Sequence, residues 1–347
     1  MSEENCSVIL AAGEGKRMKS TRPKVLSPVL FKPMLQWVID SAQSAGVTSI
    51  CVVTGYLHES VEEYLSQLNS RDPIHTDVTH VLQPERKGTG HAVMMTADFL
   101  RTHRGENVLV LNGDAPFVDA NVIAEALADH VESGNAVTVI SAVLDDPTGY
   151  GRIARDADTH RISAIVEQKD ADQATLAICE INSGAFWFKV NDLIDILSQI
   201  KNDNAQGEYY LTDAVKLLIQ SGKKANAHIT SKSCAVLGAN DCLQLNNLNS
   251  IARDEILLAH MCAGTEIPCR DGVIIGPDVA IGSDTCILPG TILRGKTTVG
   301  CGCTLGPNSF ITDSSIGDHV TLNSVQCEDC TIVPNEAIAP FSVINRI

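Results

Sequence analysis

Short apolar runs alternate with helix-like patterns along the first part of the chain. Uncharged apolar runs are typical of buried strands, and they fall at residues 7–11, 50–53, 78–82, 107–111 and 136–143. Between these runs, apolar residues at helical spacing predict helices at residues 33–46, 61–68, 91–100 and 120–132. This alternation predicts a parallel sheet that is covered by helices on both faces.

The pattern is less regular over the next hundred or so residues. We expect the following elements there: strands at 162–167, 180–189 and 226–237, a turn at 149–152, and helices at 191–200 and 212–221. A longer helical pattern follows at 241–262, with apolar residues at helical spacing. This pattern predicts a helix that connects two domains.

A six-residue repeat begins after residue 273. Its aliphatic position recurs at Ile275, Ile281, Ile287, Leu293, Val299, Leu305 and Ile311. A hexapeptide repeat indicates a parallel β-helix, whereas a run of β-hairpins would need an alternation of apolar and polar residues that is missing here. The register slips by one residue at Ile316 and again near Cys327, and we expect it to continue through Val333 and Ala339. We therefore predict about four coils, taking about three hexapeptides per coil.

These patterns divide the chain into three parts. We place a first domain at residues 1–240, a connecting helix and linker at 241–265, and a β-helix at 266–347.

The composition is that of an ordinary soluble protein of 347 residues, with 44% hydrophobic residues and a formal net charge of −16. We expect no transmembrane span and no secretory leader, and therefore a cytoplasmic protein whose twelve Cys are reduced. The pairs Cys301/Cys303 and Cys327/Cys330 loosely resemble zinc ligands, but the repeat already explains their placement. The negative charge argues against a nucleic-acid surface. An anionic substrate must therefore meet a local basic site or a divalent metal.

The turn after the first strand is a candidate phosphate site. It carries Gly13 and Gly15, then Lys16 and Arg17, with Lys24 close behind. Glycine allows backbone N–H groups to approach a ligand, and the bases supply positive charge. The spacing fits neither the Walker A loop nor the dinucleotide-binding motif with its three glycines.

Other polar segments follow strands of the same predicted sheet. A Gly-Thr-Gly turn at residues 88–90 follows the third strand, and Asp114 follows the fourth. Ligands of open α/β sheets bind beyond the carboxyl ends of the strands. We therefore expect these segments and the first turn to line one crevice.

The first two thirds of the chain carry a series of motifs: LAAGEGKRM at 10–18, PKVL at 23–26, Gln83 with GTGHA at 88–92, NGD at 112–114, DPTGYGR at 146–152, IVEQKDA at 165–171, EINSG at 180–184 and NAQGEYYLTD at 204–213. In these motifs and in their order, the chain resembles the sugar-1-phosphate nucleotidyltransferases. It is most similar to the bacterial bifunctional N-acetylglucosamine-1-phosphate uridylyltransferase / glucosamine-1-phosphate acetyltransferase family. The resemblance implies a Rossmann-like mixed-sheet nucleotidyltransferase domain that is followed by a short left-handed parallel β-helix.

The resemblance also implies roles for individual residues. Arg17, Lys24 and Asp114 would be catalytic, with Arg17 and Lys24 holding the triphosphate and the sugar phosphate. Asp114 would bind Mg²⁺ together with Asn240. The remaining substrate-binding positions would be Leu10, Ala11, Ala12 and Gly13 at the uridine, Gln83 and Gly88 at the uracil edge, Thr89 beside the nucleotide, Gly151, Glu167 and Asn182 at the sugar, and also Asn112 and Gly113. Asn112 and Ser183 depart from the family pattern, where Tyr and Thr are common.

The implied reaction joins UTP and N-acetylglucosamine 1-phosphate to give UDP-N-acetylglucosamine and pyrophosphate. The attacking phosphate oxygen is already ionised at neutral pH, since its second pKa is about 6. No general base is therefore required, and positioning and charge neutralisation carry the reaction. Lys, Arg and an oxygen-bound Mg²⁺ supply that neutralisation.

The acetyltransferase motifs of the family do not occur in this sequence, and we expect that activity to be absent. The β-helix would then mainly serve association, as a homotrimer in the manner of the family, without a nucleic-acid or membrane partner. Two alternatives stay open: a uridylyl- or thymidylyltransferase for another hexose 1-phosphate, and a non-catalytic sugar-nucleotide-binding protein. Intact motifs in the first domain and a short β-helix argue against a third, a β-helix acyltransferase with a decayed first domain.

Overall fold

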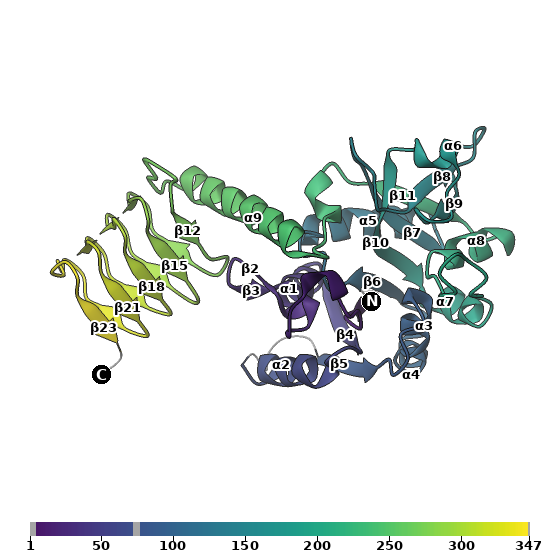
Figure 1. Cartoon of the computed structure of the whole chain (residues 1–347), viewed down its shortest axis with the longest axis horizontal. Helices are drawn as coiled ribbons and strands as arrows, with labels where there is room; N and C mark the ends of the chain where they lie inside the picture. The colour runs from purple at the N-terminus through teal and green to yellow at the C-terminus, as the bar shows by residue number, and fades with distance from the viewer. Residues whose placement is uncertain (1–4, 72–76, 346–347) are drawn as a thin grey trace. The chain divides into compact units, whose positions relative to one another are not determined.

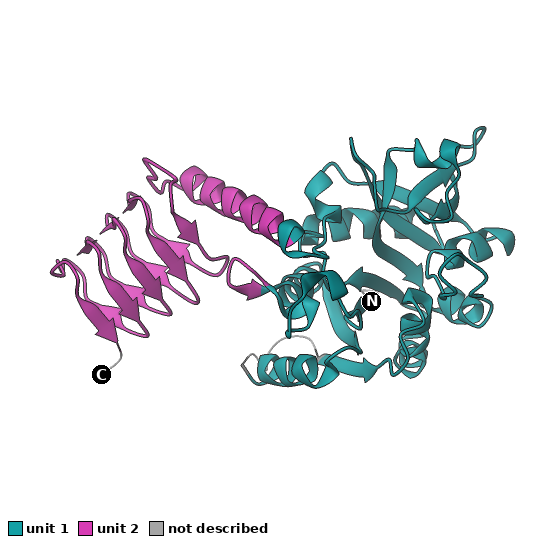
Figure 2. Cartoon of the chain, viewed as in Figure 1, with its two compact units in different colours: residues 1–27, 33–244 teal, residues 28–32, 245–347 magenta. Residues whose placement is uncertain are grey.

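A computed structural model describes residues 5–71 and 77–345 of the chain (Figure 1). The chain forms two compact units (Figure 2). Unit 1 comprises residues 1–27 and 33–244, and unit 2 comprises residues 28–32 and 245–347. The short segment 28–32 therefore groups with the C-terminal part of the chain, although it is far from it in sequence.

Unit 1 contains a sheet with helices on both sides. Its strands are β1 (Asn5–Leu10), β4 (Val47–Thr54), β5 (Asp77–Leu82), β6 (Asn107–Asn112), β7 (Val137–Val143), β8 (Arg152–Arg155), β9 (Ile162–Val166), β10 (Glu180–Lys189) and β11 (Ala225–Ile229). Its helices are α1 (Met34–Ser44), α2 (His58–Arg71), α3 (Thr89–Met94), α4 (Ala97–Thr102), α5 (Ala120–Glu132), α6 (Gln173–Leu176), α7 (Val190–Leu197) and α8 (Asp213–Gln220). Short 3₁₀ turns lie at Lys16–Met18, Lys24–Leu26 and Ser233–Val236.

The sheet is mixed, which confirms the fold that the resemblance implied. Its strand order is β11-β7-β10-β6-β1-β4-β5, with β8 paired to β10 and β9. Strands β1, β4, β5 and β6 are parallel, whereas β10 runs antiparallel between β6 and β7 (Figure 1). The wholly parallel sheet that the alternation alone predicts is therefore wrong. A later strand enters between two earlier ones, and apolar periodicity carries no information about that insertion.

Neighbouring residues of the central strands supply two apolar cores, because side chains alternate between the two faces of a sheet. Val8 belongs to the core under α3, α4, α7 and α8, and Ile9 belongs to the core under α1, α2 and α5. Val110 and Leu111 of β6 divide in the same way. Because both faces of the sheet are covered, these strands appear in the sequence as continuous apolar runs.

Three predicted elements differ from the structure. The helix expected at 91–100 is broken into α3 and α4, and buried Thr96 between them donates its hydroxyl to the carbonyl of Val93. The strand expected at 226–237 ends at Ile229, and a 3₁₀ turn at Ser233–Val236 occupies much of the rest of that range. The turn expected at 149–152 ends earlier, because Arg152 already begins β8.

Unit 2 combines a long helix with a parallel β-helix. The helix α9 spans Cys242–Cys262, and its first residues belong to unit 1. The strands are β2 (Pro28–Val29), β3 (Lys32–Pro33), β12 (Ile274–Ile275), β13 (Ala280–Ile281), β14 (Cys286–Ile287), β15 (Ile292–Arg294), β16 (Thr298–Val299), β17 (Thr304–Leu305), β18 (Phe310–Thr312), β19 (Ser315–Ile316), β20 (Thr321–Leu322), β21 (Gln326–Glu328), β22 (Thr331–Ile332) and β23 (Val343–Asn345). Strands β12 to β23 form three faces, of which the longest is β12-β15-β18-β21-β23.

The hexapeptide register is confirmed as far as Cys327 and wrong beyond it. On the longest face Ile275, Leu293, Ile311, Cys327 and Ile344 stand one above another. After Cys327, however, the next inward residue is Ile332, which is 3% exposed, whereas the predicted Val333 is 57% exposed.

The reason for this shift is a shortened corner. Asp329 adopts a left-handed conformation with φ 48°, and the turn from β21 to β22 closes one residue early. Ile338 rather than the predicted Ala339 then packs against the interior.

Two further observations bear on the sequence expectations. Across the described parts of the chain, none of the helices has both the length and the apolar character that crossing a bilayer requires. No group of three or more His, Cys, Asp or Glu side chains among the described residues is arranged to hold a metal ion.

Candidate functional site

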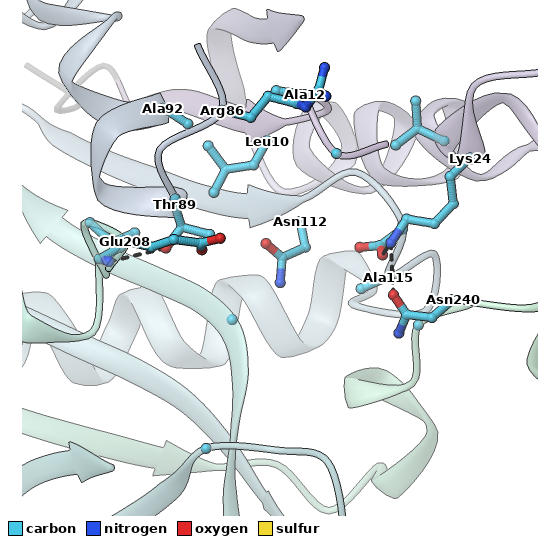
Figure 3. Close-up of a pocket in the computed structure, with 18 of the residues that line it drawn as sticks. Leu10, Ala12, Lys24, Arg86, Thr89, Ala92, Asn112, Ala115, Glu208 and Asn240 are labelled. Carbon is cyan, nitrogen blue, oxygen red and sulfur yellow. Dashed lines mark hydrogen bonds and ion pairs between the residues drawn. The ribbon is translucent and has the colours of Figure 1, made fainter. Parts of the chain in front are cut away.

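A cleft of about 1000 Å³ lies in unit 1 at the carboxyl ends of β1 and β6 (Figure 3). Most of the residues singled out from the sequence line it: Leu10, Ala12, Gly13, Arg17, Lys24, Gln83, Gly88, Thr89, Asn112, Asp114, Gly151, Glu167, Asn182 and Asn240. Two do not. Ala11 is buried in the core under α1, and Gly113 donates its N–H to the carbonyl of Leu10 at 2.9 Å behind the cleft wall.

The turn after β1 places two glycines in different roles. Gly13 has no heavy atom within 4 Å of the position of a Cβ atom and no left-handed torsion, so the fold itself does not require glycine there. Gly15 has φ 62°, and a Cβ atom there would lie 2.8 Å from Cβ of Lys24. Gly15 thus allows the turn to pack on Lys24, while Gly13 leaves open space in the cleft. Arg17 is exposed beside them.

Lys24, Asp114 and Asn240 form a polar cluster at one end of the cleft. The ammonium of Lys24 donates to the Asp114 carboxylate and, at 2.9 Å, to the side-chain oxygen of Asn240. In Figure 3 Lys24 and Asn240 point toward one another, on the side of the view opposite Thr89 and Glu208. The loop that carries Asn240 is held against the aspartate, because the N–H of Ala239 donates to the carbonyl of Asp114 at 3.3 Å.

Gln83 is buried at the cleft wall with its amide held in one orientation. Its Nε2 donates to the carbonyl of Gly88 at 3.1 Å and lies 3.0 Å from Nδ1 of His91. A carbonyl oxygen only accepts, so this contact assigns Nε2 and Oε1 of the amide. Both N–H groups of the Gln83 side chain are therefore used inside the protein, and its oxygen remains to accept from a ligand.

The Gly-Thr-Gly turn at residues 88–90 is packed on the backbone around Tyr209. A Cβ atom on Gly88 would lie 2.6 Å from the carbonyl oxygen of Tyr209, and the N–H of Gly90 donates to that oxygen at 2.7 Å. Thr89 accepts from the N–H of Leu211 at 3.1 Å through its hydroxyl. This contact brings the segment that carries Glu208 to the same wall of the cleft.

Polar groups from three strands meet at a further wall of the cleft. Asn182 donates its N–H to the carbonyl of Gly151 at 2.9 Å, and its side-chain oxygen accepts from the N–H of Gly184. The partly buried carboxylate of Glu167 accepts from the hydroxyl of Thr212 at 3.1 Å. Burial raises the pKa of the Glu167 carboxyl above its usual range. The wall thus offers a carboxylate acceptor and the free amide N–H groups of Asn182.

Sequence reasoning missed several contributors to the cleft. The following residues also line it: Glu14, Arg86, Tyr150, Glu208, Thr212 and Gln244. Arg86 and Glu14 form an ion pair at 3.0 Å between two walls of the cleft. The only sequence signal for this pair is that Glu14 lies in the LAAGEGKRM motif and Arg86 lies between Gln83 and the GTGHA motif. The sequence gives His91 no role beyond its place in the GTGHA motif, whereas in the structure it holds the Gln83 amide.

Comparisons with known proteins agree with this architecture. The nucleotidyl transferase family matches residues 6–244. The bifunctional protein GlmU of Caldanaerobacter subterraneus subsp. tengcongensis is 44% identical, over 99% of this chain and 73% of its own length. The protein of the same name from Clostridium beijerinckii is 40% identical, over 98% of this chain and 72% of its own length. A putative glucose-1-phosphate thymidylyltransferase from Bacillus anthracis, at 21% identity, shares the fold with a TM-score of 0.59, covering 72% of this chain and 96% of that one.

The fold and the polar cleft define an enzyme that transfers nucleotidyl groups. The chain belongs to the nucleotidyl transferase family and, within it, to the group of bifunctional GlmU proteins.

Proposed function

We propose that this chain transfers the uridylyl group of UTP to N-acetylglucosamine 1-phosphate and releases pyrophosphate. The orientation of Gln83 is the observation that narrows the choice of nucleotide. Its free side-chain oxygen accepts a hydrogen bond, which matches a base with a ring N–H donor, such as the N3–H of uracil, and is mismatched to the N3 acceptor of cytosine and the N1 acceptor of adenine. The choice of uracil among the bases with such a donor follows the resemblance.

The choice of sugar rests on the wall formed by Gly151, Glu167 and Asn182. An N-acetylated sugar presents hydroxyl donors together with an amide that has both a donor and an acceptor. The carboxylate of Glu167 accepts from such donors, and Nδ2 of Asn182 donates to such an acceptor, because its Oδ1 is already bonded to Gly184.

Charge neutralisation comes from the cluster around Lys24. Asp114 and Asn240 direct one carboxylate and one amide oxygen at a single cation, the ammonium of Lys24. Two such oxygens are ligands that Mg²⁺ prefers, so these residues fit the metal and would hold it. When bound, Mg²⁺ neutralises charge on the phosphates. Lys24 and Arg17 add positive charge from the protein itself.

The chain then acts mainly by holding the two anions in line. A phosphate oxygen of the sugar attacks the α-phosphorus of UTP, the new P–O bond forms, and the bond from that phosphorus to pyrophosphate breaks. Since the attacking oxygen is already ionised, no residue has to remove a proton. The residues of the cleft orient the reactants and stabilise the spread of negative charge.

A pyrophosphate-release assay tests this proposal. UTP and dTTP are each paired with N-acetylglucosamine 1-phosphate and with glucose 1-phosphate. We expect the highest kcat/KM for UTP with N-acetylglucosamine 1-phosphate, and a loss of two to three orders of magnitude in Asp114→Ala, as for removal of a group that stabilises transition-state charge. A higher kcat/KM for another pair would refute the specificity, and a wild type that releases no pyrophosphate would indicate a non-catalytic binding protein.

Two further expectations accompany the proposal. The resemblance supports a homotrimer assembled through the β-helix, and light scattering on the full chain tests it, a monomer being the contradicting result. The same resemblance, together with the absence of its motifs from this sequence, supports the expectation that the chain does not acetylate glucosamine 1-phosphate. Acetyl transfer from acetyl-CoA by the purified chain would refute that expectation.

A further inference from the structure

Arg152, the first residue of β8, is a buried cation that has no direct ion pair with a carboxylate among the described residues, and the exposed carboxylate of Asp146 attracts it only from a longer distance. It is 2% exposed. Its guanidinium donates to the carbonyl of Tyr150 and, at 2.9 Å, to the side-chain oxygen of Gln168, while its Nε is buried without a hydrogen-bond partner. Burying a charge without a direct ion pair is costly, so a residue of this kind is unfavourable for stability alone.

Arg152 lies next to the residues that form one wall of the cleft. In the sheet it stands opposite Val166 of β9 and Ile181 of β10. The three residues proposed to hold the sugar are the sequence neighbours of Arg152 and of its two partners in the sheet. Gly151 precedes Arg152, Glu167 follows Val166, and Asn182 follows Ile181. Arg152 therefore lies behind that wall, at the place where its three strands meet.

Gln168 connects Arg152 to the loop in front of it. Its side-chain oxygen accepts from Nη2 of Arg152 at 2.9 Å and from the N–H of Gly149 at 3.2 Å. Gly149 has φ 93°, and it lines the cleft together with Tyr150 and Gly151. One amide oxygen thus ties the loop at 149–151 to the residue that follows Glu167.

We propose that Arg152 and Gln168 are positioning residues that set the sugar specificity of the enzyme. They fix the loop at 149–151 and the carboxylate of Glu167 relative to one another, although neither lines the cleft itself. This inference rests on the proposed function, because it assigns the sugar to that wall. It predicts that loosening the pair weakens recognition of the sugar phosphate and leaves recognition of the nucleotide intact.

Two substitutions at Gln168 separate positioning from general packing. Gln168→Glu keeps an oxygen that accepts from both Arg152 and Gly149, whereas Gln168→Met has similar length and accepts from neither. We expect Gln168→Met to raise KM for the sugar phosphate about ten-fold and to lower the preference for N-acetylglucosamine 1-phosphate over glucose 1-phosphate. KM for UTP should stay within about two-fold of the wild type, and Gln168→Glu should behave like the wild type.

Substitutions at arginine supply the matched control. Arg152→Lys keeps the charge and loses the planar fork, and it should show the same rise in KM for the sugar phosphate. Arg161→Met, in the exposed turn between β8 and β9, should change neither KM. Melting temperatures of all variants show whether any of them fails to fold.

The outcomes distinguish the two proposals. Unchanged KM values in Gln168→Met and Arg152→Lys, or a parallel rise of both KM values, would overturn the positioning role while the proposed function stands. If the wild type prefers another sugar 1-phosphate, the sugar part of the proposed function fails, and the KM comparison is made with that sugar. A wild type that accepts no sugar 1-phosphate overturns both.

Discussion

Lys24 and Asp114 are 90 residues apart in the sequence, and their side chains form an ion pair in the cleft. The side chain of Lys24 is 12% exposed and that of Asp114 20% exposed, so little water screens the pair. Asn240 completes the contact from a third segment of the chain. The ammonium of Lys24 thus already neutralises the oxygens that are proposed to hold a metal.

Removing the ammonium should therefore strengthen metal binding in the absence of nucleotide. We expect Lys24→Met to bind Mn²⁺ several-fold more tightly than the wild type, because the oxygens of Asp114 and Asn240 lose a competing cation. Titration with Mn²⁺, followed by electron paramagnetic resonance, measures this affinity. Lys16→Met removes a base that is 79% exposed and should leave the affinity unchanged. Equal or weaker Mn²⁺ binding in Lys24→Met would refute the competition.

We expect Gly13 to be required for binding of the nucleotide and not for folding. Its backbone is unstrained and its surroundings are empty, so Gly13→Ala should leave the free energy of unfolding unchanged within about 0.5 kcal/mol. The added methyl group would stand in the cleft, and we expect KM for UTP to rise about ten-fold. Chemical denaturation and steady-state kinetics of the same preparation test both parts. An unchanged KM would mean that the nucleotide does not approach Gly13.

Gly15→Ala should behave differently. Its left-handed torsion and its contact with the Lys24 side chain make any Cβ unfavourable. We expect a loss of at least ~1 kcal/mol in the free energy of unfolding, together with lower transfer activity because Lys24 is displaced. Stability equal to that of Gly13→Ala would contradict this prediction.

Glu167→Gln should stabilise the protein while weakening sugar binding. The folded pKa of Glu167 is raised by burial, so the folded state holds its proton more tightly than the unfolded state does. Stability therefore falls as pH rises through the unfolded and then the folded pKa, and the full penalty is present above both. Glutamine has no such penalty and still accepts from Thr212, so we expect a higher melting temperature at pH 7 than in the wild type.

The advantage of Glu167→Gln should disappear in acid, where the wild-type carboxyl is protonated. Melting temperatures measured between pH 4 and pH 7 test this dependence, and a constant difference across the range would contradict it. KM for the sugar phosphate should rise, because an amide oxygen accepts more weakly than a carboxylate.

His130 should produce an acid limb in the stability profile. Burial, with the positive charge of Lys189 as a smaller cause, lowers its pKa from 6.5 to about 4. Between these pH values the unfolded state binds a proton that the folded state does not bind. The free energy of unfolding therefore falls as the pH drops from 6.5 towards 4, by up to about 3 kcal/mol. We expect His130→Gln to flatten this limb in urea denaturation. His103→Gln, at the end of α4, should keep the wild-type limb, and an equally steep limb in His130→Gln would exclude the assignment.

Much of the fold could be predicted because its cores impose strict patterns. The strand β6 is buried on both faces and therefore appears as an apolar run, and inward residues such as Ile275 recur at the period of the coil. What could not be predicted depends on contacts between distant segments. Nothing local shows that β10 inserts next to β6, or that the corner at Asp329 is one residue short.

The candidate site shows the same division. Residues at the ends of strands, such as Asp114, could be expected to meet because parallel strands end at one edge of a sheet. The role of His91 could not be foreseen, since it depends on the orientation of the Gln83 amide. In the sequence Arg152 is only the last residue of the DPTGYGR motif, and its burial in the structure is what sets it apart from an ordinary surface base.

The shortened corners of the β-helix have a consequence for how such a unit tolerates change. Successive inward residues on the longest face, from Ile275 to Ile344, keep their stacking although the coils between them differ in length. Corners therefore absorb insertions and deletions, while the strands keep a constant spacing of about 4.8 Å. Peptides grafted at successive corners would therefore be displayed at regular intervals, which the constant spacing of the strands sets.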